Sequence, residues 1–276
     1  LSAEQMLHTF DAYDSLKQWL LCIRKAQRRD GALPGIIPTA GWGFQFGNGP
    51  AWDSVLIELP YQLYRFYGKD EIIKENAEAI EKYFGYIKTR LNADGLIEIG
   101  LGDWCQTYTS AEGDYETPVE ITDSLTIIDM VEKTAEMFGV IGKNAEDIKQ
   151  FGNYLKNSFR QKYIKNGQLT VKTQTALSMC LQLNIFNAEE VQTAYETLLS
   201  EIKKQNDHFR VGVIGYKYLF DVLVKKGNQD LCFKLITQKS FPSYGYVIDC
   251  GATTLWESFD EYERINGKLM RKDGVE

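Results

Sequence analysis

Apolar side chains recur every three or four positions through most of this 276-residue chain. Because an α-helix turns once every 3.6 residues, this spacing predicts amphipathic helices that each bury one face. About nine such helices of ordinary length fit the pattern, so we predict an all-α fold. The clearest faces comprise Leu7, Phe10, Leu16, Leu20 and Ile23 on one long helix, then Ile73, Ile80, Phe84, Ile87 and Leu91, then Ile148, Phe151, Leu155 and Phe159, and finally Val191, Tyr195, Leu198 and Ile202.

The connections between these helices are of two kinds, short turns and long segments rich in glycine and aromatic residues. Residues 67–71 and 138–147 are short, whereas 30–50, 92–118 and 238–251 are long. Antiparallel helix pairs joined tightly at one end and loosely at the other would gather the long loops on one face, where loops commonly carry function. Neither a change of composition nor a fixed-period repeat divides the chain, so we expect residues 1–276 to form a single domain.

The charge balance argues against nucleic-acid binding. The chain has 31 basic and 38 acidic residues and a net charge of -7. Nucleic-acid phosphates are held by clustered lysine and arginine, and no such cluster is present in the sequence. No apolar run approaches the roughly 20 residues that span a bilayer, so we expect no membrane partner either.

Cysteine and histidine usage argues against metal and cofactor sites. The five cysteines are scattered, odd in number and without CxxC spacing, which predicts free and mostly buried thiols. The only two histidines, His8 and His208, disfavour a Ser-His-Asp hydrolase or a histidine-rich metal site. We therefore expect the chain to use no cofactor and no metal.

Tryptophans concentrate at the long connections. Trp42, Trp52 and Trp104 lie in or just after them and Trp256 follows the last one, whereas Trp19 lies mid-helix, as core tryptophans usually do. A pyranose has an apolar C–H face that stacks on an indole ring, and hydroxyl groups that carboxylates can bind. Each tryptophan alone is compatible with ordinary packing, but the group of four indicates a sugar site.

Three of these tryptophans stand beside an acidic residue, in the sequences AWDS, GDWC and LWES. The last lies within GATTLWESFD (251–260), which has two interpretations. In the first, Thr253 or Thr254 caps a helix that has Glu257 in its first turn, where the helix dipole favours negative charge. In the second, Trp256 is a sugar platform beside Glu257, which acts as a catalytic base.

Three segments together resemble the catalytic domain of the bacterial α-L-rhamnosidases (glycoside hydrolase family 78). They are residues 48–88, which begin GNGPAWDSV, GLGDW at 100–104 and GATTLWESFD at 251–260. The resemblance runs along nearly the whole chain and implies an (α/α)6 six-hairpin toroid. It also implies an inverting glycoside hydrolase that removes terminal, non-reducing α-L-rhamnose from oligosaccharides or glycosides.

The resemblance implies roles for individual residues. Glu257 corresponds to the general base that activates the attacking water. Trp52 and Trp104 correspond to aromatic walls of the rhamnose subsite, closing on the C6 methyl group and the ring. The same motifs contain three further candidate substrate-binding residues, for which capping and packing are the alternative roles: Asp53, Asp103 and Trp256.

The sequence departs from the family in two places. An inverting hydrolysis needs a carboxylic acid for the leaving oxygen and a carboxylate for the water, about 6.5–9.5 Å apart. Nothing in the chain matches the Asp-Arg-Glu-Trp-Asp run that carries the family's acid, or the Asn-His segment after its base motif. We therefore expect a toroid that is incomplete at both ends, inactive or nearly so on its own, and prone to form a homodimer through exposed helix faces.

Acidic residues after Trp104 are the best internal candidates for further pocket carboxylates. The favoured alternative is an acidic start to the helix expected near Pro118, because proline and acids are common in a first helical turn. The candidates are Asp114, Glu116 and Glu120.

Other classes of function stay open at this point. A different six-hairpin glycosidase would share the toroid and the aromatic loops but act on another sugar. A degenerate, non-catalytic carbohydrate-binding domain would keep the tryptophans without hydrolysing anything. A helical scaffold is disfavoured, because the chain has no regular repeat and its loops are rich in glycine and aromatic residues.

Overall fold

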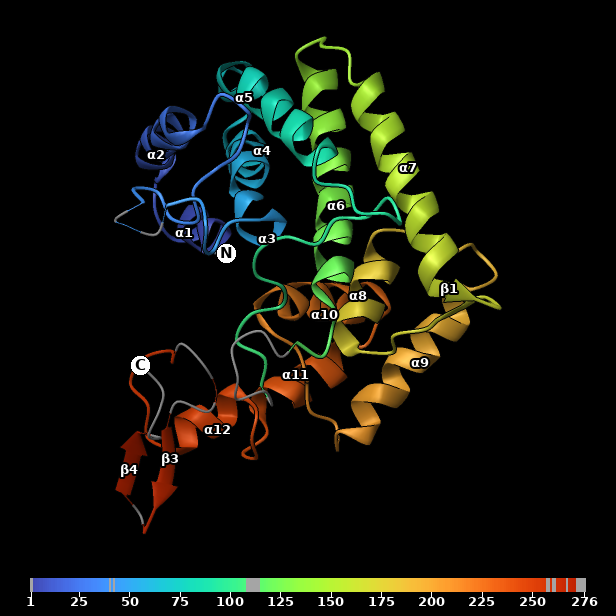
Figure 1. Ribbon diagram of the computed structural model, residues 1–276. Helices are drawn as coiled ribbons and strands as arrows, with labels where there is room; N and C mark the ends of the chain where they lie inside the picture. Colours follow the sequence, from blue (N-terminus) through green and yellow to red (C-terminus); the bar gives the residue numbers. More distant parts are fainter. Residues whose placement is uncertain are drawn as a thin grey trace. The chain divides into compact units, whose positions relative to one another are not determined.

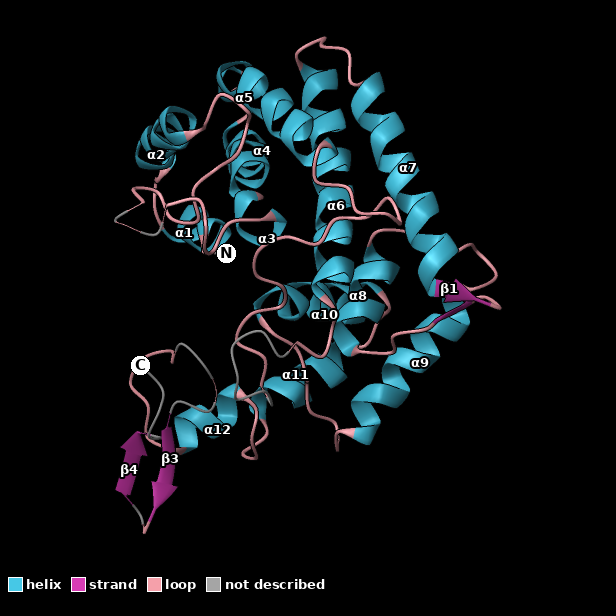
Figure 2. Ribbon diagram, viewed as in Figure 1, coloured by secondary structure: helices cyan, strands magenta, loops and turns pink. Residues whose placement is uncertain are grey.

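The computed structural model describes residues 2–39, 41, 43–107, 115–256, 259, 262–266 and 268–271. Over these residues the fold is mainly helical, with four short strands (Figures 1 and 2). The helical class predicted from the sequence is confirmed. The contacts divide the chain into two compact units: unit 1 comprises residues 1–102 and 119–162, and unit 2 comprises residues 103–118 and 163–276.

Unit 1 is built around α4 (Val55–Tyr67), which contacts four of the other helices, α1, α2, α5 and α6. Gly68 adopts a left-handed conformation at the end of α4, which lets the chain turn back into α5. At Gly152 the absent side chain lets α7 approach Val131 of α6. The other helices of unit 1 are α1 (Ala3–Thr9), α2 (Tyr13–Ala26), α3 (Pro50–Asp53), α5 (Glu71–Lys88), α6 (Val119–Val140) and α7 (Glu146–Tyr163), whose last residue belongs to unit 2.

Most of the apolar faces expected from the spacing are buried. Ile80 and Phe84 on α5 and Leu155 and Phe159 on α7 have almost no exposed surface. Trp19 is the exception, because 37% of its surface is exposed. Its indole N–H donates to the carbonyl oxygen of residue 37 at 3.0 Å, so Trp19 covers a loop rather than filling the core, and the prediction of a core tryptophan was wrong.

The single long helix predicted from Leu7 to Ile23 is wrong. The chain forms two helices, because Phe10 ends α1 in an extended conformation (φ -134°, ψ 154°) with 66% of its side chain exposed. The break is held by a hydrogen bond from the Tyr67 hydroxyl to Oδ1 of Asp11, at 2.9 Å. A contact between residues so far apart in the chain leaves no signal in local spacing.

Unit 2 is built from α8 (Gln174–Gln182), which packs against α9 (Val191–Lys204) and α10 (Val213–Lys225). α10 continues the packing to α11 (Gln229–Thr237), and α11 contacts α12 (Tyr244–Asp249). Two antiparallel strand pairs complete the unit, with Ile164 opposite Leu169 in one and Tyr262 opposite Arg271 in the other. The strands are β1 (Ile164–Lys165), β2 (Gln168–Leu169), β3 (Tyr262–Ile265) and β4 (Lys268–Arg271).

The long loop predicted at 238–251 contains a helix. α12 begins after Ser243, whose hydroxyl oxygen accepts a hydrogen bond from the backbone N–H of Tyr246 at 2.9 Å. This is a regular N-cap, and Val247 is buried on the inner side of the helix. The Gly and Tyr residues of this stretch hid the short helix, because they are weak helix formers.

The helix predicted to start at Thr253 or Thr254 is not present. The described residues from Gly251 to Trp256 are turns, bends and irregular backbone, and the next element among the described residues is β3, which begins at Tyr262. Glu257 itself lies outside the described residues. What the described residues exclude is the N-cap at Thr253 or Thr254, because Leu255 and Trp256 after them are not helical.

None of the described helices combines the length and the apolar character required to span a bilayer. Among the described residues, no three His, Cys, Asp or Glu side chains lie close enough together to hold a metal ion. Three of the five cysteines are buried, as expected from the sequence, and Cys22 and Cys105 are partly exposed.

Candidate functional site

Trp52 is presented by the short helix α3, and its neighbour Asp53 holds that helix in place. Trp52 is half-buried and Asp53 is buried. Oδ2 of Asp53 accepts hydrogen bonds from the backbone N–H of Gly49 and from the hydroxyl of Tyr83, both at 3.1 Å. Because Tyr83 lies on α5, Asp53 ties the turn that carries Trp52 to a long helix of unit 1.

Burial sets the protonation of Asp53. Loss of water raises the pKa of Asp53 to about 8, against the opposing effect of the hydrogen bonds from Gly49 and Tyr83. The same burial, and then the nearby Asp53 charge, raises the pKa of Tyr83 well above its ordinary value. At neutral pH Asp53 therefore keeps its proton. Its buried hydrogen bonds are those of a residue that holds the backbone of a turn in place.

A second buried acid, Asp123 on α6, holds a neighbouring loop. Its Oδ2 accepts the backbone N–H of Ile99 at 2.8 Å, and its Oδ1 is buried without a hydrogen-bond partner in the described part of the chain. Burial raises the pKa of Asp123 well above its ordinary value, and Asp53 and Glu98 add to the effect. Asp123 lies on α6, the helix against which α3 packs.

The two loops held by these acids touch each other at glycines. Gly49 has a φ of +115° and Gly100 a φ of +79°, a region that side-chain-bearing residues rarely adopt. A Cβ atom on Gly49 would collide with the backbone oxygen of Ile99, and one on Gly100 with that of Asn48. The loop that leads into Trp52 is therefore supported by backbone packing as well as by Asp53.

Asp103, in unit 2, caps a helix that begins more than a hundred residues later in the chain. Its Oδ2 accepts from the Thr175 hydroxyl at 2.5 Å and the Gly212 N–H at 2.8 Å. Its Oδ1 accepts from the N–H groups of Ile214 and Gly215, both at 2.9 Å. Burial raises the pKa of Asp103, and these four hydrogen bonds oppose the rise. Four donors fill the usual capacity of a carboxylate, which leaves no lone pair for a substrate hydroxyl.

Trp104 is held through its backbone by the same helix start. Its carbonyl oxygen accepts the backbone N–H of Val213 at 2.8 Å, while its side chain is half-buried. A Cβ atom on Gly212 would collide with the carbonyl oxygens of Asp103 and Trp104, so the close approach needs glycine there. The beginning of α10 and the chain at Trp104 form one hydrogen-bonded block.

Trp52 in unit 1 and Trp104 in unit 2 thus share one local arrangement. Each is a half-buried indole next to a buried aspartate, and each aspartate accepts backbone N–H groups from a helix start or from the residue before one. These contacts hold the backbone at each tryptophan. This arrangement favours the positioning role for both aspartates over direct contact with a sugar.

The third motif is only partly described. Trp256 is half-buried with its ring against Tyr262, at a centroid distance of 4.9 Å and a tilt of 45°. Glu257, the predicted general base, lies outside the described residues, and so do Trp42 and Asp114. Their expected roles stay predictions.

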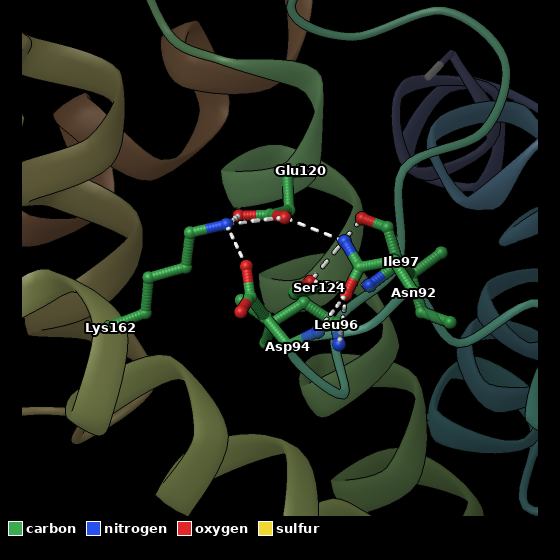
Figure 3. Close-up of polar contacts among 7 residues, drawn as sticks. All are labelled: Asn92, Asp94, Leu96, Ile97, Glu120, Ser124 and Lys162. Atoms are coloured by element: carbon green, nitrogen blue, oxygen red, sulfur yellow. Dashed lines mark hydrogen bonds and ion pairs between the residues drawn. The ribbon is translucent and has the colours of Figure 1, made fainter.

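Glu120 belongs to a polar cluster inside unit 1 rather than to an open site (Figure 3). Its carboxylate is paired with Lys162 of α7 at 2.7 Å and accepts the side-chain amide of Asn92 at 2.6 Å. Lys162 also pairs with Asp94 at 2.6 Å, and Oδ1 of Asn92 accepts the N–H groups of its own turn. These contacts join α6, α7 and the turn at 92–97, which supports the structural role weighed for Glu120.

Glu116 is also engaged within its own unit. Its carboxylate pairs with the guanidinium of Arg210, and its backbone N–H donates to Oε1 of Gln106 at 3.0 Å. The loop end that follows the undescribed residues 108–114 is therefore fixed in unit 2. These contacts favour a structural role for Glu116 as well.

Sequence reasoning missed the partners that hold the two tryptophans. Tyr83 and Asp123 in unit 1, and Thr175 in unit 2, were not singled out. Asp123 had a weak signal, because it is an acidic residue between the apolar residues Ile121 and Leu125 of a helical run, where a buried polar group needs a partner. Gly212 and Gly215 were not singled out either, and their sequence GVIG is no signal by itself, because the same four residues at 139–142 lie at the end of α6.

Comparison with known proteins identifies one family. The family model described as the bacterial alpha-L-rhamnosidase 6 hairpin glycosidase domain matches residues 1–273. An alpha-L-rhamnosidase of Streptomyces avermitilis is 28% identical over 264 residues, which cover 94% of this chain and 25% of the relative. One from Alteromonas sp. is 27% identical over 271 residues, which cover 95% of this chain and 29% of the relative.

Solved structures of the same kind match closely. The alpha-L-rhamnosidase from Dictyoglumus thermophilum matches with a TM-score of 0.86 at 30% identity, over 98% of this chain and 30% of that chain. The Streptomyces avermitilis alpha-L-rhamnosidase complexed with L-rhamnose matches with a TM-score of 0.87 at 25% identity, over 98% of this chain and 25% of that chain. The chain spans between 25% and 30% of the length of these relatives.

Proposed function

The chain belongs to the bacterial alpha-L-rhamnosidase six-hairpin glycosidase domain family, and from this premise we propose that it carries the sugar-cleaving domain of an inverting α-L-rhamnosidase. The substrate is a terminal, non-reducing α-L-rhamnose on an oligosaccharide or glycoside. The observation that carries the proposal is the match over residues 1–273, because that range includes all three tryptophan–acid motifs. L-rhamnose in the Streptomyces avermitilis complex supports the class of sugar.

Glu257 is the general base of the proposed reaction. As the glycosidic bond breaks, a water attacks C1 from the face opposite the leaving group and gives a proton to the Glu257 carboxylate. A glutamate with access to solvent is ionised at neutral pH, as this role requires. The sugar is released as β-L-rhamnose, and the proton on the leaving oxygen comes from a carboxylic acid, a role to which we assign no residue of this chain.

Trp52 and Trp104 are the apolar walls of the proposed rhamnose subsite. L-rhamnose has a methyl group at C6, and an indole surface accepts that methyl in preference to a hydroxymethyl group. Discrimination of this kind against an added hydroxyl is modest, on the order of 100-fold. We assign Asp53 and Asp103 to positioning these two tryptophans, since their carboxyl groups accept backbone amides. Trp256 remains a candidate residue for contact with the sugar.

The proposal also covers the organisation of the protein. Residues 1–276 form one (α/α) toroid domain, and a second copy associates through exposed apolar side chains of the helices. The largest such side chains on consecutive helices of unit 2 are Phe233 on α11 and Ile248 on α12, each 70% exposed. Covering exposed apolar side chains with a second copy removes them from water, which favours association.

The experiment compares hydrolysis of an aryl α-L-rhamnoside by three proteins: this chain, the full-length product of its gene, and that product with Glu257→Gln. We expect the full-length protein to be active, and Glu257→Gln to lower kcat by about 10²- to 10⁴-fold, the usual contribution of an acid–base group. We expect the 276-residue chain to be inactive or nearly so. A full-length protein that cleaves another glycoside but not rhamnosides would reassign it to a different six-hairpin glycosidase. Sugar binding without hydrolysis would make it a binding domain.

A further inference from the structure

The turn that leads into Trp52 rests on a second loop of unit 1. Gly49 of the turn and Gly100 of the loop touch, because neither has room for a Cβ atom beside the backbone of the other segment. The carbonyl oxygen of Gly49 accepts the backbone N–H of Trp52 at 3.0 Å. The place of the Trp52 backbone therefore depends on Gly49, and the place of Gly49 depends on the loop.

The helix α6 holds this loop with two consecutive side chains. Oδ2 of Asp123 accepts the backbone N–H of Ile99 at 2.8 Å. The hydroxyl oxygen of Ser124 accepts the backbone N–H of Ile97 at 3.0 Å (Figure 3). A Cβ atom on Gly49 would collide with the backbone oxygen of Ile99. α6 thus holds the loop at the residue that the Trp52 turn touches.

The surroundings of Asp123 are unfavourable for an acid. The residue has no exposed surface, and its Oδ1 has no hydrogen-bond partner within the described residues. Taking a polar oxygen out of water without a partner costs free energy. Burial raises the pKa of Asp123 well above its ordinary value, and the charges of Asp53 and Glu98 add to the rise. A leucine has the same branched shape and would avoid these costs. What the acid provides in return is the hydrogen bond to Ile99.

We propose that Asp123 is a positioning residue for Trp52, because it holds the loop on which the turn before Trp52 rests. The inference rests on the proposed role of Trp52 as a wall of the rhamnose subsite. Asp53 anchors the same turn to α5 through Tyr83, and Asp123 supplies a second anchor, to α6. An apolar wall contacts the sugar before and during the reaction, so its displacement weakens binding more than it slows the chemical step.

The test compares Asp123→Leu with Asp123→Asn in the full-length protein, with an aryl α-L-rhamnoside as substrate. Leucine accepts no hydrogen bond, whereas the amide oxygen of asparagine accepts the N–H of Ile99. We expect Asp123→Leu to raise KM about 3- to 10-fold while kcat stays within about twofold of wild type, and Asp123→Asn to keep KM within about twofold. An unchanged KM in Asp123→Leu, or an equal rise in both variants, overturns the inference.

Trp52→Ala shows whether the effect passes through the tryptophan. Alone, it should raise KM at least about tenfold, because it removes the apolar wall. With Trp52→Ala present, Asp123→Leu should change KM less than about twofold, since no wall is left to displace. The same factor in both backgrounds would show that Asp123 acts on another part of the site, and would overturn the inference. If Trp52→Ala leaves KM unchanged, the wall assignment fails and the inference fails with it.

A second readout does not depend on activity. In the 276-residue chain, amide exchange at Gly49, Trp52 and Ile99 should be at least about tenfold faster in Asp123→Leu than in Asp123→Asn, because loop and turn open together once the anchor is lost. Faster exchange at Ile99 alone would show that the turn does not depend on the loop, and would overturn the inference. A full-length protein that cleaves no rhamnoside would refute the proposed function, whereas the exchange still decides whether Asp123 holds the Trp52 turn.

Thr134→Val is the matched control on the same helix. Thr134 is fully buried, and its hydroxyl has no hydrogen-bond partner in the described part of the chain. It lies about 16 Å further along the axis of α6 than Asp123, so its substitution removes a buried polar atom far from the loop. We expect KM and kcat to stay within about twofold of wild type. A rise in KM equal to that of Asp123→Leu would show that a general change in α6 explains both.

Gly100→Ala disturbs the same contact from the loop side, and it replaces Asp123→Leu if the leucine variant does not fold. Its control is Gly142→Ala, because both glycines have left-handed backbones, with φ of +79° and +67°. A Cβ atom on Gly100 would collide with the backbone oxygen of Asn48, whereas one on Gly142 meets nothing within 4 Å. Both alanines carry similar backbone strain, but only Gly100→Ala should raise KM, by about 3- to 10-fold. Equal KM values for the two variants would overturn the inference.

Discussion

Asp53 and Asp103 are buried aspartates beside tryptophans, but their carboxyl groups are bound differently. Asp53 receives two hydrogen bonds, both on Oδ2, and its pKa is raised by burial to about 8. Asp103 receives four hydrogen bonds, two on each oxygen. Asparagine has the same shape as aspartate and can therefore replace Asp53 with little loss of stability. At Asp103 the same replacement would leave hydrogen-bond donors without acceptors.

The matched substitutions Asp53→Asn and Asp103→Asn test this difference. At pH 4, where Asp53 of the folded protein is protonated and therefore neutral like asparagine, we expect Asp53→Asn to change the free energy of unfolding by less than about 1 kcal/mol, because its amide oxygen accepts both hydrogen bonds. Asp103→Asn should cost about 2–4 kcal/mol, because its amide nitrogen faces two N–H or O–H donors. Urea unfolding of both variants gives the comparison, and equal losses would contradict it.

Asp53 also makes the free energy of unfolding depend on pH in a specific way. Its pKa is raised from an ordinary 3.8 to about 8, so between these values the folded state binds more protons than the unfolded state. The stabilisation is complete below about pH 4 and is lost as pH rises towards 8, by at most about 1.4 kcal/mol per pH unit. Unfolding measured from pH 4 to 9 should show the Asp53→Asn variant gaining stability relative to wild type up to pH 8. Parallel pH profiles for the two proteins would exclude the raised pKa.

At the scale of elements, the first residues of α10 bind the segment that carries Trp104. The N–H groups at this start bind Asp103 and Trp104 instead of water, and the approach is close enough to require Gly212. Helix starts leave N–H groups that need partners, and here the partner is more than a hundred residues away. The position of Trp104 therefore depends on the geometry of α10.

Gly212→Ala tests this dependence. Its Cβ would collide with the backbone oxygens of Asp103 and Trp104, so we expect a loss of several °C in the thermal midpoint and weaker binding of rhamnose. The control is Gly139→Ala in α6, where a Cβ meets nothing within 4 Å and should be neutral or stabilising by about 0.5–1 kcal/mol. If the two alanines behave alike, the packing argument at α10 is wrong.

The helices that could be predicted are those whose burial follows from local spacing. The faces on α5, α7 and α9 were read correctly because each packs one continuous apolar stripe. The break at Phe10, the helix α12 and the β3–β4 hairpin were missed, because they depend on tertiary contacts or on weak local signals. The hydrogen bond from Tyr67 to Asp11 is an example, since it joins residues 56 apart.

The candidate site could likewise be predicted from the sequence only in part. The motifs placed Asp53 beside Trp52 and Asp103 beside Trp104, because neighbours in the chain stay neighbours in the fold. The partners that give the aspartates their roles, such as Tyr83 and Thr175, are 30 and 72 residues away from them. Only the folded structure brings these donors to the carboxyl groups.

At the scale of the whole molecule, the proposed homodimer makes a direct prediction. Phe233 and Ile248 are each 70% exposed on consecutive helices, and burying such side chains favours association. We expect analytical ultracentrifugation to show dimers of this chain at tens of micromolar, and the double substitution Phe233→Ser with Ile248→Ser to shift the protein to monomers. A wild-type chain that sediments as a monomer at every concentration would rule the dimer out.

The central claim is that this chain carries an inverting rhamnosidase domain, and the anomer released first tests it most directly. Proton NMR during hydrolysis of an aryl α-L-rhamnoside by the full-length protein follows both sugar release and configuration at C1. The account predicts that β-L-rhamnose accumulates first and that the α anomer grows in later by mutarotation. Release of α-L-rhamnose as the first product would contradict the roles assigned to Glu257 and its water, and an absence of any rhamnose would contradict the substrate itself.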